Sequence, residues 1–321
     1  MTYCLTLGHD QQPITLSRKT KPMTKLQGVI TPLLTPFEDN GSIARDLWVS
    51  HAKWVLEQGA HYLSPFGTTG EALSMSCGER VEAVDWLVDA GIPADRLMPG
   101  TGVPSLAETL VMSRHAVSRG CAAIMVLPSF FFTQASEDGH FRYFSELIEG
   151  INDDALKICL YNIPQNSGVA ITPSLAARMN VAFPDAVVAY KDSSGDWSNT
   201  VAVIEASPSL AVFPGSESFL TQGLDAGGAG CISATMNLNA GAIRKVFEGK
   251  TAGDDVEALD KDIKTFRKIV QNADLISAMK AALAVRSGDD RWLNIRAPLM
   301  NARKQQGVDV LDKLGSLASH I

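Results

Sequence analysis

The chain has 321 residues, 45% of them hydrophobic and 20% charged, and its formal net charge at pH 7 is −7. This composition is ordinary for a globular protein. The negative charge and the absence of a Lys/Arg-rich block argue against a nucleic-acid or anionic-membrane partner, and no apolar run approaches the ~20 residues of a membrane-spanning helix.

The five cysteines are scattered, odd in number and never arranged as CxxC (Cys4, Cys77, Cys121, Cys159 and Cys231). Disulfide frameworks are typical of short secreted domains, whereas a long chain with this pattern usually keeps reduced thiols. We therefore predict free cysteines and a cytoplasmic location. The segment before residue 26 is polar and predicts an extension that precedes the folded domain.

From residue 26 onward, short apolar segments alternate with stretches of helical periodicity. Apolar positions that recur three and four residues apart predict helices, as at 46–59, 105–120 and 137–151. The apolar segments between such stretches predict eight strands: 28–34, 61–67, 97–102, 122–128, 157–164, 187–191, 210–215 and 230–235.

Local signals mark several helix ends. Ser105 with Glu108 predicts a capping box, and Thr172 before a proline predicts a helix start with proline in its first turn. Gly59 and Gly120 stand where helices are expected to stop, because glycine adopts the left-handed conformation that ends a helix.

Eight strand–helix units predict an α/β fold, a (β/α)8 TIM barrel, since strands apolar on both faces agree with a parallel sheet covered by helices. A doubly wound open sheet is the main alternative, but it often has a glycine-rich phosphate turn after its first strand, which is missing here. Beyond residue 250 the pattern is helical throughout. We predict three parts: the extension 1–25, the barrel 26–250, and a C-terminal helical region 251–321 that packs on the barrel.

Lys191 ends the strand segment 187–191, and active sites of such barrels lie at the carboxyl ends of the strands. A lysine is rarely buried without a partner or a task. Apolar surroundings disfavour the ammonium form of an amine. A neutral amine attacks ketones to give a Schiff base, which is an electron sink for making or breaking the neighbouring carbon–carbon bond. The alternative is a structural lysine that pairs with Asp192 or Glu217.

Tyr161 lies near the end of the preceding strand segment and offers a phenol for proton transfer at a reacting carbonyl. A tyrosine that caps a core strand is otherwise commonly structural. The turn GTTGE, residues 67–71, combines the hydroxyls of Thr68 and Thr69 with closely spaced backbone N–H groups, which suits a carboxylate. The histidines lack metal-ligand spacing and the serines lack a GxSxG elbow, so we predict no metal site and no serine nucleophile.

The motifs GTTGE at 67–71, YNIP at 161–164 and YKDSSG at 190–195 together resemble the dihydrodipicolinate synthase / N-acetylneuraminate lyase family, as do GTG at 100–102 and GCISAT at 230–235. The resemblance covers nearly the whole chain from about residue 26. It implies a class I aldolase-type lyase on a (β/α)8 barrel with C-terminal helices. It also implies a homo-oligomer, a tetramer or a dimer, with no metal or organic cofactor.

By the same resemblance, Lys191 forms an imine with pyruvate or another 2-keto acid, and Tyr161 shuttles protons. Thr68 and Thr69 are then expected to hold the keto-acid carboxylate. The remaining substrate contacts are expected at the rim, from Gly67, Asn166, Ser167, Ser193, Gly215, Glu217 and Ser233.

Two positions depart from the family's pattern. Asn166 stands where the synthases carry an arginine that holds the carboxylate of aspartate semialdehyde, and a neutral amide cannot replace a charged bidentate fork. Phe130 stands where synthases and sialic-acid lyases carry a tyrosine. Both departures argue against dihydrodipicolinate synthesis. The phenylalanines at 130–132 leave two interpretations: a second substrate with an apolar part, or a sugar acid read by other loops.

We therefore predict an enzyme, a Schiff-base lyase or aldolase that cleaves or forms a carbon–carbon bond between pyruvate, or a related 2-keto acid, and an unidentified aldehyde. Two alternatives use the same imine: 4-hydroxy-tetrahydrodipicolinate (dihydrodipicolinate) synthase, and a dehydratase of deoxy-keto sugar acids. A third alternative is a keto-acid-binding regulatory protein without turnover.

Overall fold

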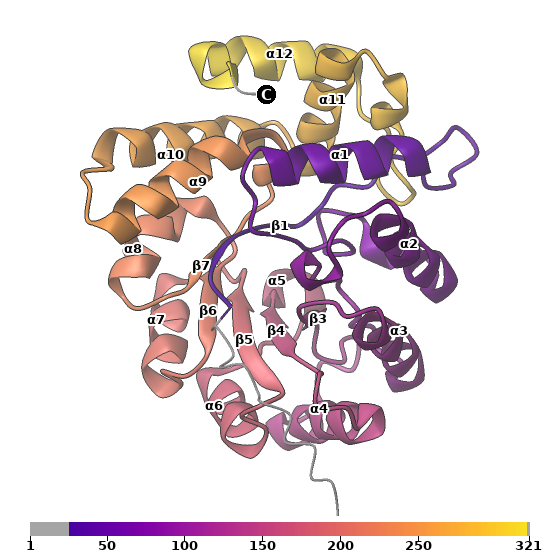
Figure 1. Ribbon diagram of the computed structural model, residues 1–321, viewed down its shortest axis with the longest axis vertical. Helices are drawn as coiled ribbons and strands as arrows, with labels where there is room; N and C mark the ends of the chain where they lie inside the picture. The colour runs from indigo at the N-terminus through magenta and orange to yellow at the C-terminus, as the bar shows by residue number, and fades with distance from the viewer. Residues whose placement is uncertain (1–25, 320–321) are drawn as a thin grey trace, which may run out of the picture.

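The computed structural model of the protein describes residues 26–319, and the predicted extension 1–25 lies outside the described residues. Parallel strands form the centre of the molecule, and helices surround them (Figure 1). The strands are β1 (Gly28–Thr31), β2 (Tyr62–Leu63), β3 (Ile124–Val126), β4 (Ile158–Asn162), β5 (Val187–Asp192), β6 (Ala211–Pro214) and β7 (Gly230–Ile232).

The strands form two parallel sheets, in the orders β2-β1-β7 and β3-β4-β5-β6. Ala229 joins the two sheets at the edges formed by β6 and β7. Its N–H donates to Val212 of β6 and its carbonyl accepts from Gly28 of β1, both at 2.8 Å. Segment 97–101 joins the other pair of edges. The eight predicted strand segments therefore close into a (β/α)8 barrel, as predicted.

The third predicted strand, 97–102, contains no regular strand residues in the structure. Its backbone still bridges β2 and β3, since Met98 N donates to Leu63 O at 2.8 Å and Thr101 N donates to Met125 O at 2.9 Å. Pro99 has no N–H to give to a ladder, which explains the interruption. Glycine is required at the next position, because a Cβ on Gly100 would lie 2.1 Å from the Phe66 carbonyl oxygen.

The predicted helix signals are confirmed with one exception. Thr172 accepts from Leu175 N at 3.0 Å and precedes a proline in the first turn, as predicted. Ser105 accepts from Glu108 N at 3.3 Å, but the reciprocal half of its capping box is not formed. The helices around the barrel are α1 (Arg45–Glu57), α2 (Cys77–Asp89), α3 (Leu106–Ser118), α4 (Glu137–Ile151), the short α5 (Pro164–Ser167), α6 (Pro173–Ala182), α7 (Trp197–Ala206), α8 (Leu220–Asp225) and α9 (Met236–Ala252).

The C-terminal helices pack on one side of the barrel, beside α1 and α9 (Figure 1). Their contact is apolar: Phe266 and Trp292 are buried in one cluster with Leu34, which follows β1, and Leu238 of α9. The predicted boundary at residue 250 falls in the last turn of α9. The region comprises α10 (Glu257–Asn272), α11 (Leu275–Ser287) and α12 (Lys304–Leu314).

Single-turn 3-10 helices complete the architecture: η1 (Ala72–Ser74), η2 (Ala94–Arg96), η3 (Glu217–Phe219), η4 (Asp290–Leu293) and η5 (Gly315–Ala318). The cysteines between residues 26 and 319 are all free thiols, in agreement with the prediction, and Cys4 lies outside this range. Within the same range, no helix has the length and apolar character that crossing a membrane requires.

Candidate active site

Lys191 lies near the carboxyl end of β5, and only 4% of its surface is exposed. In the parallel ladder between β4 and β5 it is in register with Tyr161, which is 3% exposed. Its Nζ lies 4.0 Å from the centroid of the Tyr161 ring. Side chains alternate along a strand, so Lys191 and its neighbour Asp192 point to opposite faces of the barrel wall.

Asp192 does not pair with Lys191, although it is adjacent in sequence. Both oxygens of its carboxylate are occupied by other donors from β4 and from the start of α7. This leaves no lone pair for an ammonium group, because a carboxylate has about four acceptor positions. The four donors, at 2.8–3.0 Å, are Asn162 Nδ2 and Ser194 N to Oδ1, and Asn199 Nδ2 and Thr200 Oγ1 to Oδ2.

Glu217, the other predicted partner of Lys191, is fully buried and faces the C-terminal region. It accepts hydrogen bonds from Ser233 and Thr235 at the end of the last strand, and its Oε2 lies 3.5 Å from Nη1 of Arg267 in α10. Within residues 26–319, Lys191 therefore has no ion-pair partner. The structural alternative that paired Lys191 with Asp192 or Glu217 does not hold.

Tyr161 connects the lysine to the turn after β2. Its phenol oxygen lies 3.0 Å from the hydroxyl oxygen of Thr68, and either group can donate. Thr68 is exposed, whereas Thr69 is 9% exposed. Lys191, Tyr161 and Thr68 thus form one continuous chain of contacts across three barrel strands.

The backbone of turn 67–71 is held in an unusual shape. Phe66 before it and Glu71 at its end have φ angles of 63° and 59°, in the left-handed region that non-glycine residues rarely adopt. Such conformations persist where surrounding contacts enforce them, and they cluster at functional sites. Within the described chain, the N–H groups of Thr68 and Thr69 donate to no other residue, so both are available to an anion.

A cleft of about 390 Å³ opens beside these residues. Ile276 of α11 and the segment 298–299 contribute one side of it, so the C-terminal region forms part of the site. Its other lining residues come from the barrel: Phe66, Gly67, Thr68, Glu71, Ala72, Leu73, Ser74, Gly100, Gly102, Met125, Leu127, Phe130, Tyr161, Ile163, Asn166 and Ser167.

The predicted site residues fall into three groups. Gly67, Thr68, Tyr161, Asn166 and Ser167 line the cleft. Lys191 and Thr69 are not among the lining residues of the cleft. The amine of Lys191 contacts the ring of Tyr161, which does line the cleft. Ser193, Gly215, Glu217 and Ser233 lie outside the cleft wall, where Gly215 packs against Ser193 so closely that a Cβ would meet its hydroxyl at 2.2 Å.

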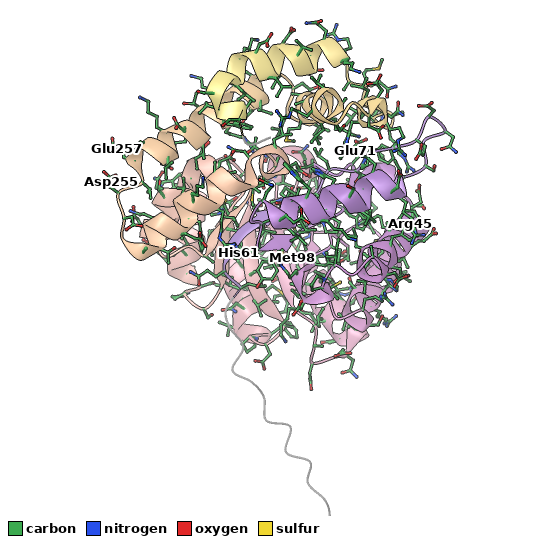
Figure 2. The ribbon with its side chains drawn as sticks, turned by 45° about the horizontal axis from the view of Figure 1, so that its top comes forward. Arg45, His61, Glu71, Met98, Asp255 and Glu257 are labelled. Carbon is green, nitrogen blue, oxygen red and sulfur yellow. The ribbon has the colours of Figure 1, made fainter. Side chains whose placement is uncertain are left out.

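Sequence reasoning missed the buried ion pair between Glu71, at the cleft, and Lys280 of α11, whose side chains are both 0% exposed. Lys280 Nζ lies 2.5 Å from Glu71 Oε1 and donates to Asn294 O at 2.7 Å, while Arg296 N donates to Glu71 Oε2 at 2.9 Å. Burial lowers the pKa of Lys280 to about 8, although Glu71 opposes that shift. Figure 2 shows Glu71 on the side of the barrel that the C-terminal helices approach.

The only available signal for this pair was an acidic residue in a turn and a lysine in the mostly apolar stretch 275–284. Among residues 26–319, no cluster of His, Cys, Asp and Glu has the arrangement of a metal site. The groups that this site offers are an amine, a phenol, threonine hydroxyls and backbone N–H groups.

Comparison with known proteins identifies the family of the chain. Residues 25–315 match the model of the dihydrodipicolinate synthetase family. An uncharacterized DapA-like lyase of Chloroflexus aurantiacus is 33% identical over 279 residues, which cover 87% of this chain and 92% of that protein. The 4-hydroxy-tetrahydrodipicolinate synthase of Rhizobium meliloti is 31% identical over 235 residues, covering 73% and 78% of the two chains.

Solved structures show the same architecture. The crystal structure of dihydrodipicolinate synthase from Agrobacterium tumefaciens is 30% identical, with a TM-score of 0.83 and coverage of 91% of this chain and 99% of that chain. YagE, an E. coli K12 prophage protein solved in complex with pyruvate, is 21% identical and shares the fold with a TM-score of 0.81, covering 91% and 98%. The chain thus belongs to the dihydrodipicolinate synthetase family and is a DapA-like lyase of the class I aldolase type.

Proposed function

We propose that this protein is a Schiff-base lyase that forms or cleaves a carbon–carbon bond next to a 2-keto acid such as pyruvate. One observation carries the proposal: Lys191 is a buried amine at the end of a barrel strand, in register with Tyr161 and without a carboxylate partner among residues 26–319. Membership in a family of lyases supports this reaction class.

Turn 67–71 is the proposed binding site for the keto-acid carboxylate. The N–H groups of Thr68 and Thr69 are unoccupied by described residues, and the Thr68 hydroxyl adds a further donor. Hydrogen bonds from backbone N–H groups to a carboxylate are charge-assisted and therefore strong. Held there, the keto acid places its carbonyl carbon beside Tyr161, within reach of Lys191.

The reaction follows from the order of these groups. The amine of Lys191 attacks the carbonyl carbon, and Tyr161 protonates the oxygen, which leaves as water when the imine forms. Tyr161, left deprotonated by that step, takes a C3 proton to give an enamine, whose carbon attacks the aldehyde to form the new bond while Tyr161 returns the proton to the aldehyde oxygen. Water then hydrolyses the imine and regenerates the amine. Thr68 relays protons to and from Tyr161 through their 3.0 Å hydrogen bond, and the cleavage reaction runs through the same steps in reverse.

Borohydride trapping tests the proposal. Incubation with pyruvate and sodium borohydride, followed by intact mass measurement and peptide mapping, is expected to place one reduced adduct on Lys191 and none on Lys280, the second buried lysine. The Lys191→Ala variant is the control and should remain unmodified. An adduct on another lysine, or no adduct with pyruvate or longer 2-keto acids, contradicts the proposed mechanism.

Turnover assays beside the trapping separate the alternatives. A protein that traps pyruvate but turns over neither an aldehyde nor a deoxy-keto sugar acid is the regulatory protein. Turnover of aspartate semialdehyde identifies a dihydrodipicolinate synthase. Loss of water from a deoxy-keto sugar acid, without carbon–carbon cleavage, identifies a dehydratase.

We further propose that the protein is a cytoplasmic homo-oligomer, a dimer or a tetramer. Free thiols in the described chain support the location. Phe131 and Phe132 support the assembly: they are 80% and 70% exposed and contact each other edge to face at 5.5 Å between ring centroids. Exposed aromatic residues of this size are typical of protein contact surfaces. Light scattering during size-exclusion chromatography gives the mass, and a monomer would contradict the assembly.

A further inference from the structure

The lining of the cleft combines polar groups with hydrocarbon side chains. Thr68 and Tyr161 provide hydroxyls where the keto acid is proposed to bind. Six other lining residues, which we name the apolar wall, carry hydrocarbon side chains and come from five separate parts of the chain. The apolar wall consists of Phe66, Leu73, Phe130, Ile163, Ile276 and Leu299.

The apolar wall includes exposed residues. Leu73 is 61% exposed and Leu299 is 47% exposed, and both face the same cleft although one follows β2 and the other follows η4. Exposed hydrophobic side chains that converge on one small-molecule cleft are typical of a binding surface for an apolar ligand.

Among residues 26–319, no cationic side chain is part of the cleft lining. Glu71 is the single charged residue in its lining, and its carboxylate is taken by Lys280 and by the N–H of Arg296. The guanidinium of Arg296 is itself occupied by Glu79 and by the carbonyl groups of Gly41 and Ser74.

Besides Lys191 and Lys280, Arg80 is a buried basic residue near the cleft. It donates to the Gly100 carbonyl and lies 5.8 Å from the centroid of the Phe66 ring, so it contacts residues of the lining without belonging to it. Asn166, within α5, contributes an uncharged amide. A second carboxylate or a phosphate would therefore lose its hydration in this cleft without gaining a charged partner.

We propose that the aldehyde partner is uncharged and apolar, and that its side chain lies on the apolar wall, with Leu73, Ile276 and Leu299 determining the selectivity. The proposal rests on the function proposed above and specifies its second substrate. The enamine carbon derived from pyruvate attacks the aldehyde carbon, and the aldehyde oxygen takes the proton that C3 lost, carried by Tyr161, to become a hydroxyl group. The water released when the imine forms is consumed when it hydrolyses, so the product is a 4-hydroxy-2-oxo acid with an apolar substituent.

Two matched pairs of aldehydes test the proposal with the full-length protein and pyruvate. The first pair is 3-methylbutanal and glyceraldehyde, which have the same number of non-hydrogen atoms but differ in polarity. The second is benzaldehyde and 4-carboxybenzaldehyde, which differ by one carboxylate. We expect kcat/KM to favour the apolar member of each pair by at least about 10-fold, since a polar group placed on the apolar wall loses its hydration without gaining a partner there. Equal values, or a preference for the polar members, overturn the proposal.

Variants locate the selectivity in the apolar wall. Leu299→Asp places a carboxylate beside the bound aldehyde and should lower kcat/KM for 3-methylbutanal at least about 10-fold. Val181→Asp is the matched control, because Val181 of α6 is 81% exposed and lies outside the cleft lining. Asn166→Arg should raise kcat/KM for 4-carboxybenzaldehyde relative to benzaldehyde, since it adds the missing cation. Unchanged values in both cleft variants overturn the proposal.

Borohydride trapping of pyruvate is measured on every sample and separates the two levels of inference. No adduct on Lys191 means that the proposed function itself fails. An adduct on Lys191 without turnover of either apolar aldehyde overturns the apolar partner and leaves the imine mechanism standing.

Discussion

Two lysines are buried among the described residues, and they differ in what surrounds them. Lys280 of α11 is 0% exposed, contacts Glu71 and the carbonyl of Asn294, and lies 4.7 Å from the centroid of the Phe37 ring. Lys191 of β5 is 4% exposed, and its described contact is the face of the Tyr161 ring.

The difference shows how this fold separates structure from chemistry. The ammonium group of Lys280 donates to the carboxylate of Glu71 and to the carbonyl of Asn294. The pair with Glu71 joins the C-terminal region to turn 67–71. At Lys191, the nearby carboxylates are occupied elsewhere, so the amine remains available to a substrate. A lysine that serves packing is paired, whereas a lysine that serves as a nucleophile is left without a carboxylate.

The largest expected effect comes from Lys191→Met. We expect kcat to fall by at least about 10³-fold, because the covalent step is lost. The free energy of unfolding in urea should stay equal or rise, since an unpaired buried amine is replaced by an apolar side chain. A variant that loses activity together with several kcal/mol of stability would place Lys191 among the structural residues and would remove the contrast with Lys280.

Lys280→Met should have the opposite profile. Removing one member of a buried pair leaves an uncompensated carboxylate, and we expect a loss of about 3–5 kcal/mol in the free energy of unfolding. The double variant Glu71→Gln/Lys280→Met is the matched control and should recover most of that loss. Urea denaturation followed by tryptophan fluorescence measures both. Equal stability of the single and double variants would show that the pair is not energetically coupled.

The pH dependence of stability sharpens the same contrast. In the folded protein the pKa of Lys280 is lowered to about 8 from 10.5. Between these values the unfolded chain binds more protons than the folded chain, so the Lys280 contribution to the free energy of unfolding rises with pH. The rise is at most about 3 kcal/mol. Urea titrations of wild type and the Glu71→Gln/Lys280→Met double variant between pH 8 and 10.5 isolate it as their difference, and parallel curves would contradict it.

The smallest expected effect concerns the hydrogen bond that orients Tyr161. Thr68→Val keeps the shape of the side chain and removes the hydroxyl, which costs about 0.5–1.5 kcal/mol for one hydrogen bond. We expect kcat/KM to fall roughly 2- to 10-fold by that energy. Thr68→Ser retains the hydroxyl and should restore most of the rate. Failure of the serine variant to recover activity would argue against a proton relay through Thr68.

Much of the fold could be predicted because strand order, apolar strand faces and helix signals agree along the chain. The irregularity of the third strand could not be predicted. Pro99 interrupts its hydrogen bonding only because the segment lies between β2 and β3, and the sequence does not show which strands lie beside it. Ser105 was predicted to form a full capping box and forms half of one, because the side-chain position of Glu108 depends on its surroundings rather than on spacing.

The centre of the site was predictable for a geometric reason. The carboxyl ends of parallel strands meet at one rim, which brings Lys191, Tyr161 and Thr68 together. The outer parts of the site depend on how the C-terminal helices, which are distant in sequence, pack against the barrel. Glu217 and Ser233 looked available at the rim, but α10 returns over them and supplies Arg267. For the same reason no local pattern indicated that Ile276 and Leu299 line the cleft.

The four hydrogen bonds to Asp192 have a consequence for refolding. A shift of β5 by one residue against β4 would turn every side chain to the opposite face, so that Asp192 entered the barrel and Lys191 left it. Those hydrogen bonds would then be lost, so they stabilise the correct alignment of β5 against β4. With Lys191 outside the barrel, a misaligned chain could not form the imine. The yield of trapped adduct after renaturation would therefore report the fraction of molecules in which β5 is correctly aligned.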